Sequence, residues 1–132
     1  DDLVVLPGDF SWAMYLEDTK KDFEFLNSLP GKKLLLKGNH DYWWNSLEKM
    51  KKFLKDNHFE NIEFIQNNSF LWEDKIIAGT RGWSFQEENV KKCIYGHIHG
   101  TAGKDAIQGN IDGIEYIMAS ADQIDFDLIK IC

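Results

Sequence analysis

The chain has 132 residues, of which 43% are hydrophobic and 28% are charged, and its formal net charge is −7. This composition is that of a globular protein of single-domain length, and no apolar run is long enough for a membrane span. The acidic balance disfavours nucleic acid as a partner, because nonspecific binding needs a basic face, while bound divalent cations would still admit a small anionic substrate. We therefore expect neither a membrane nor a nucleic acid as partner.

The first half of the chain predicts alternating strands and helices. Strands are expected at 3–7 (LVVLP) and 33–37 (KLLLK), because each is a short apolar run that ends at Pro-Gly or before Gly. Both strands are expected to be buried, the first of them on both faces. A helix is expected within 15–29, where apolar residues keep near-helical spacing. A second helix is expected next, opened by Asn45 as N-cap with Glu48 three residues later. The apolar face of this second helix is expected to hold Trp43, Leu47, Met50 and Leu54.

The second half is rich in short apolar runs separated by polar turns. The expected strands are IEFI (62–65), SFLW (69–72), KIIAG (75–79), KCIYG (92–96), IEYIMA (114–119) and FDLIKI (126–131). Together the two halves predict the α/β class with more than one sheet. The two cysteines, Cys93 and Cys132, form no CxxC pattern, so we expect reduced thiols in a cytoplasmic protein.

Three glycine-containing motifs each follow an expected strand: LPGDF at 6–10, KGNHD at 37–41 and YGHIHG at 95–100. Loops at the carboxyl ends of strands converge on one rim of an α/β sheet, and glycine lets the backbone approach an ion closely. The polar side chains collected by these motifs are Asp9, Asn39, His40, Asp41, His97 and His99. Each motif alone is also typical of a turn or a helix cap, but their combination favours a site for Mn, Fe or Zn over Ca or Mg.

These blocks resemble the calcineurin-like metallophosphoesterase family, whose signature runs D-x-H, GD, GNHD or GNHE, a separate His, and GHxH. The resemblance implies a four-layer αββα sandwich that forms a single domain over residues 1–132. It also implies a dinuclear centre of two divalent metal ions. The implied reaction is the hydrolysis of phosphate mono- or diesters of a small substrate by a hydroxide that the two metals activate.

The same resemblance implies which residues bind the metals. Asp9 would bridge the two ions. Asn39 and His97 would bind one of them, and His99 would bind the other. Carboxylate, amide and imidazole groups are all ordinary ligands of such ions.

The resemblance also implies catalytic roles for the two residues that follow Asn39. His40 would protonate the leaving oxygen, and Asp41 would orient His40. Arg81, in GTRGW, is a candidate for binding a substrate phosphate, with a structural or solvent role as the alternative. Three tryptophans near the expected rim are candidates for pocket walls or for the core: Trp12, Trp43 and Trp83.

Two blocks of the family signature are absent from the sequence. No D-x-H block precedes the GD block, and the histidine between GNHD and GHxH is His58, which we expect in solvent at the end of the second helix. We therefore expect an incomplete chain that lacks an N-terminal strand and a segment near 83–89. With Asp9 and His99 as its remaining ligands, one metal should bind weakly. The alternative function is a non-catalytic metal-binding or interaction remnant of the same fold.

Overall fold

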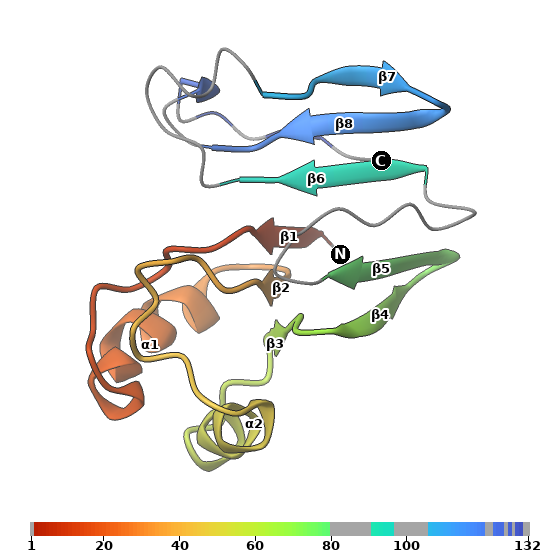
Figure 1. Ribbon diagram of the computed structural model, residues 1–132. Coiled ribbons are helices and arrows are strands. Elements are labelled where there is room, and N and C mark those ends of the chain that lie inside the picture. Colours follow the sequence, from red (N-terminus) through yellow and green to blue (C-terminus); the bar gives the residue numbers. More distant parts are fainter. Residues whose placement is uncertain are drawn as a thin grey trace. The chain divides into compact units, whose positions relative to one another are not determined.

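The computed structural model describes residues 2–79, 91–96, 106–120, 123–125, 127 and 129–130 (Figure 1). The chain divides into two compact units, Asp1–Gly82 and Trp83–Cys132. The described residues form a mixed α/β structure with few helices and several sheets, which confirms the predicted class. Within these ranges no helix is long and apolar enough to cross a membrane. A single domain over 1–132 stays a prediction.

The first unit begins with the alternating strands and helices that the sequence predicts. Its elements in chain order are β1 (Leu3–Leu6), a 3-10 helix (Leu16–Thr19), α1 (Lys20–Ser28), β2 (Lys32–Leu35), α2 (Leu47–Asp56), β3 (Ile62–Phe64), β4 (Asn68–Trp72) and β5 (Lys75–Gly79). In Figure 1, α1 and α2 lie on one side of β1, β2 and β3, and the β4–β5 hairpin lies on the other side. The helices therefore cover one face of the first sheet.

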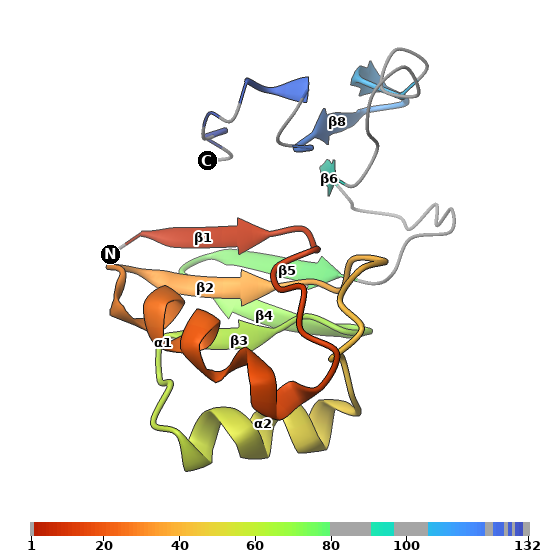
Figure 2. The same ribbon diagram turned by 90° about the vertical axis from the view of Figure 1, so that its left-hand side faces the viewer.

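The strands β1, β2 and β3 form a parallel sheet in that order (Figure 2). Leu6 of β1 pairs with Leu35 of β2, and Leu35 pairs with Phe64 of β3, so the three strands end at one edge of the sheet. β2 is the central strand and is largely buried, as predicted. β1 was expected to be buried on both faces, but its four residues are only half-buried because it is the edge strand of the described sheet.

An aromatic core lies between the helices and the sheet. Phe23 of α1 is fully buried and meets the ring of Trp43 edge-on, with 5.4 Å between the ring centroids. The other members of this core are Leu16, Leu26, Leu35, Met50, Leu54, Phe59, Ile62 and Phe64. Met50 and Leu54, predicted for the apolar face of the second helix, are buried in this core, and Leu47 is partly buried. Trp43 is buried there too, but it lies before α2, which begins at Leu47, so its predicted place on the helix was wrong.

The N-terminus of α2 differs by one residue from the prediction. The N-cap is Ser46, whose side chain accepts a hydrogen bond from the backbone N–H of Lys49 at 3.4 Å. The expected cap, Asn45, instead accepts a hydrogen bond from the backbone N–H of Ser46 at 3.1 Å. The prediction of Asn45 as N-cap was therefore wrong, because two adjacent residues both offer a capping oxygen and the helix begins at Leu47.

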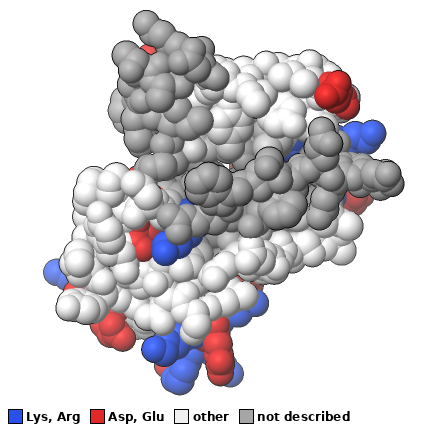
Figure 3. Space-filling view, in the orientation of Figure 1, with Lys and Arg blue, Asp and Glu red and all other residues white. Residues whose placement is uncertain are grey.

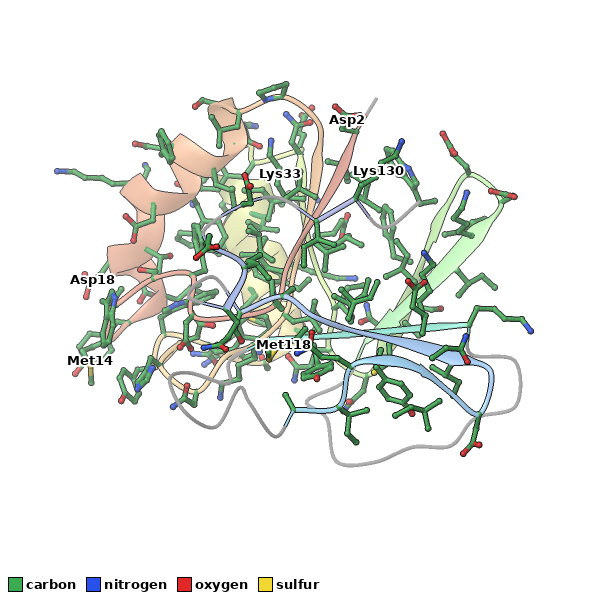
Figure 4. The ribbon with its side chains drawn as sticks, turned by 90° about the horizontal axis from the view of Figure 1, so that it is seen from above. Asp2, Met14, Asp18, Lys33, Met118 and Lys130 are labelled. Carbon is green, nitrogen blue, oxygen red and sulfur yellow. The ribbon has the colours of Figure 1, made fainter. Side chains whose placement is uncertain are left out.

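Both helices have features that the sequence indicates only in part. α1 ends before Pro30, as predicted, and the buried Lys33 side chain donates a hydrogen bond to the carbonyl of Leu29, the C-cap residue. In the view of Figure 4, Lys33 lies between α1 and β1, and its burial lowers the pKa of its ammonium group. Figure 3 shows charges of both signs gathered over α2. The exposed charged residues of α2 are Glu48, Lys49, Lys51, Lys52, Lys55 and Asp56.

The second unit contains a small three-stranded sheet. Its strands are β6 (Lys92–Tyr95), β7 (Gly109–Ile111) and β8 (Ile114–Met118), with β8 in the centre, parallel to β6 and antiparallel to β7. Cys93 is a half-buried free thiol of β6, and burial raises its pKa. β7 was not predicted, and the strand expected at 126–131 is not formed by its described residues 127, 129 and 130.

Candidate functional site

Two of the three glycine-containing loops meet at the carboxyl edge of the first sheet. The PGD loop follows β1 and the GNHD loop follows β2, and these strands are parallel neighbours. A Cβ atom placed on Gly8 would lie 2.5 Å from the Cα of Gly38, and one placed on Gly38 would lie 2.0 Å from Oδ1 of Asp9. Gly8 also has a φ of 123°, in the region that favours glycine. Both positions therefore require glycine for the loops to touch.

The carboxylate of Asp41 joins the two loops. This side chain is fully buried, and its two oxygens accept hydrogen bonds from four backbone amides and one indole. Oδ2 accepts from the amides of Asp9 and Gly38, each at 2.8 Å. The donors to Oδ1 are the amides of Phe10 at 2.9 Å and Ser11 at 3.3 Å and the indole of Trp43 at 3.0 Å. These donors compensate the loss of hydration that burial of a carboxylate entails.

Asp9 is turned toward His40 by its backbone. Its φ is 55°, a left-handed conformation that costs a non-glycine residue energy and that is common at functional sites. One carboxylate oxygen, Oδ1, accepts a hydrogen bond from the backbone N–H of His40 at 2.9 Å. The other, Oδ2, lies 3.0 Å from Nδ1 of the His40 ring. Both side chains are partly exposed, so the pair faces the edge of the sheet.

This pairing corrects one expectation. Asp41 was expected to orient the His40 imidazole, but Asp9 is the carboxylate that contacts it. The reason is that Asp41 directs its oxygens to the amides of the PGD loop and to Trp43. Asp41 therefore acts on His40 indirectly, through the position that it gives to Asp9.

The structure brings together the four described residues that the sequence singled out. Asn39 is exposed, and its Nδ2 lies 3.4 Å from Nε2 of His40. Asp9, Asn39, His40 and Asp41 thus share the carboxyl edge of β1 and β2. The other predicted site residues, Arg81, His97 and His99, lie outside the described residues, as does the segment 83–89. His58 is exposed and follows Asn57, the C-cap residue of α2, as predicted.

Two aromatic side chains flank His40. The ring of Trp12 stacks on the imidazole, with 5.2 Å between centroids and 23° between planes. The ring of Tyr42 meets the imidazole edge-on at 6.1 Å. Trp12 is 78% exposed and Tyr42 is 54% exposed, whereas Trp43 is buried in the core. Sequence reasoning missed Tyr42, and the available signal was its position directly after GNHD.

Two side chains at this edge are of kinds that can bind a divalent cation. In the part of the chain that the structure describes, no three His, Cys, Asp or Glu side chains are grouped so as to hold a metal ion. The potential donors present are the Asp9 carboxylate and the Asn39 amide, both of which suit a divalent cation. Further ligands would have to come from residues such as His97 and His99.

Comparisons with known proteins add no second line of support. No protein-family model matches the chain, and neither a curated protein nor a solved structure matches it.

Proposed function

We propose that the protein is a metal-dependent phosphoesterase that hydrolyses phosphate mono- or diesters, with the four-layer αββα fold that the motif resemblance implies. The supporting observation is that two motifs about thirty residues apart meet at the carboxyl edge of adjacent parallel strands. There they hold a carboxylate oxygen of Asp9 and a ring nitrogen of His40 3.0 Å apart. A plain turn or helix cap would not require the glycine contacts and the left-handed Asp9 that accompany this pair.

Two divalent cations, Mn, Fe or Zn, belong to the proposal. The donors at this edge fit such ions, because Asp9 contributes a partly exposed carboxylate and Asn39 an exposed amide. His97 and His99 would complete the ligand set. When bound, the cations would activate a water molecule as nucleophile and neutralise the phosphoryl oxygens.

The residues of the chain would orient the reacting groups and move a proton. The contact between Nδ1 of His40 and Asp9 fixes the direction of the imidazole, and we assign proton transfer to the departing oxygen to Nε2. Asp41 would act as a positioning residue, because its carboxylate accepts a hydrogen bond from the backbone N–H of Asp9 and so would hold Asp9 in its left-handed conformation. Arg81 remains a proposed ligand of the substrate phosphate.

The test is hydrolysis of aryl phosphate mono- and diesters by the protein with Mn²⁺. We expect Mn²⁺-dependent turnover that falls at least about a hundredfold in Asn39→Ala and His97→Ala. Asn45→Ala is the matched control, since Asn45 is also an exposed asparagine before α2 but is neither a proposed ligand nor the helix cap. Turnover that is unchanged in Asn39→Ala and His97→Ala would reject the mechanism.

Elemental analysis separates the enzyme from the alternative function. Two ions per chain, together with turnover, favour the phosphoesterase. One ion or none, together with no turnover, favours a non-catalytic metal-binding or interaction protein of the same fold.

A further inference from the structure

We propose that Trp12 and Tyr42 form an aromatic subsite beside His40 that binds a planar ring carried by the leaving group of the ester. The ring would be an aryl group or a nucleobase, which present the same flat apolar surface. This inference rests on the proposed function, because it names the class of group that the phosphate ester carries. The two sources of the ring are distinguished by experiment below.

The first observation is that the exposed aromatic surface lies directly at the proposed catalytic imidazole. Trp12 stacks on His40 at 5.2 Å, and Tyr42 meets the same ring at 6.1 Å. Because His40 is assigned to the departing oxygen, a group attached to that oxygen would lie within reach of these two rings. The subsite therefore recognises the leaving alcohol rather than a remote part of the substrate.

The second observation is that the fold does not use these two rings in its core. The PGD loop and the GNHD loop already supply Phe10 and Trp43 to the core, where both pack against Phe23. Trp12 and Tyr42 remain 78% and 54% exposed. A large exposed aromatic surface next to polar groups is typical of a binding site.

Two neighbours of Trp12 extend the apolar surface along the same loop. Met14 is 60% exposed and Tyr15 is 69% exposed. In Figure 4, Met14 lies at the outer edge of the unit, near Asp18 of the 3-10 helix that precedes α1. The ring contacts of His40 within the described residues come from Trp12 and Tyr42, so we assign the stacking contact to these two alone.

The test compares two phosphonates that are not hydrolysed and differ only in the ring. Phenylphosphonate and methylphosphonate are titrated into the protein with Mn²⁺ by isothermal calorimetry. We expect phenylphosphonate to bind about tenfold more tightly, a ratio within the range measured for the stacking of one planar ring on an aromatic side chain. No preference for the phenyl compound, or no binding of either compound, would overturn the proposal.

Variants assign the preference to Trp12. Trp12→Ala should lose the preference for the phenyl ring while still binding methylphosphonate, which also shows that the variant is folded. Trp12→Phe should keep most of the preference. The matched control is Phe25→Ala, because Phe25 is an aromatic residue of α1 that is 67% exposed and contacts no proposed site residue in the described structure. A preference that survives in Trp12→Ala would overturn the proposal.

Substrates then distinguish the source of the ring and separate this inference from the proposed function. Phenyl phosphate and adenosine 5′-phosphate are compared with glycerol 2-phosphate as substrates of the protein and of Trp12→Ala. The aromatic substrate whose kcat/KM advantage over glycerol 2-phosphate falls in Trp12→Ala identifies the ring. If the esters are hydrolysed but Trp12→Ala loses no advantage for an aromatic substrate, the subsite alone is overturned. If phenylphosphonate is preferred and the preference depends on Trp12, but no ester is hydrolysed, the proposed function alone is overturned.

Discussion

Replacement of Asp41 by asparagine tests whether one buried carboxylate holds the two loops together. The substitution keeps the shape of the side chain and one acceptor oxygen, but it turns the other oxygen into an NH₂ donor. If that donor takes the place of Oδ2, it faces the amides of Asp9 and Gly38, which are both donors at 2.8 Å in the wild type. If the amide is flipped, the NH₂ faces the three donors that Oδ1 accepts from. Either orientation leaves at least two donors without an acceptor, and at least one of them is buried.

The expected loss in the free energy of unfolding follows from these lost hydrogen bonds. A hydrogen bond to a charged group contributes about 1.5–3 kcal/mol, so two lost bonds amount to roughly 3–6 kcal/mol before the loops relax. A domain of ordinary stability unfolds with about 5–15 kcal/mol, so the variant would lose a large share of its stability. We also expect Mn²⁺ binding to weaken, because Asp9 would no longer be held in its left-handed conformation.

Urea unfolding followed by fluorescence measures this loss. The matched control is Asp56→Asn, since Asp56 is an exposed carboxylate whose ion pair with Lys52 on α2 should contribute at most about 1 kcal/mol. An Asp41→Asn variant within about 1 kcal/mol of the wild type would refute the reasoning, because the loss of at least two of the five hydrogen bonds to this carboxylate should destabilise the fold by more than that.

Two further predictions concern the glycine contact and the buried lysine. Gly38→Ala should reduce Mn²⁺-dependent turnover at least about a hundredfold, because its Cβ would overlap Oδ1 of Asp9; near-normal turnover would show that the loops separate without harm. Burial lowers the pKa of Lys33 in the folded protein below 10.5, its ordinary value in the unfolded chain. Between the folded and the unfolded pKa the unfolded chain binds more protons, so the free energy of unfolding rises with pH in that range. Urea unfolding at several alkaline pH values should show this rise in the wild type and a flatter profile in Lys33→Met, and identical profiles would contradict the assignment.

Local sequence signals predicted much of the first unit. Apolar runs that end at glycine located β1 and β2, and because both strands belong to one parallel sheet, the motifs that follow them had to meet at one edge. This parallel pairing is sufficient to bring Asp9, Asn39, His40 and Asp41 together, whatever contacts their side chains make.

What the sequence did not predict depends on how the backbone turns. The carboxylate that contacts the His40 imidazole is that of Asp9 and not that of Asp41. Asp9 reaches the ring because its backbone is left-handed, and no spacing of residues in the sequence indicates that conformation. The exposure of β1 follows from its place at the sheet edge, which is a property of the pairing order. β7 was missed because its residues are all exposed and show no apolar alternation, although Asp112 and Gly113 form the turn expected of a tight hairpin.

The central claim is that the PGD and GNHD loops hold a hydrolytic metal centre at the edge of the first sheet. The most direct measurement is hydrolysis of an aryl phosphate diester by the protein after chelation of metals and again after Mn²⁺ is restored, in the wild type and in His40→Ala. We predict turnover that is lost on chelation, returns with Mn²⁺, and returns at least about a hundredfold less in His40→Ala. Turnover that persists without metal, or that returns fully in His40→Ala, would contradict the claim.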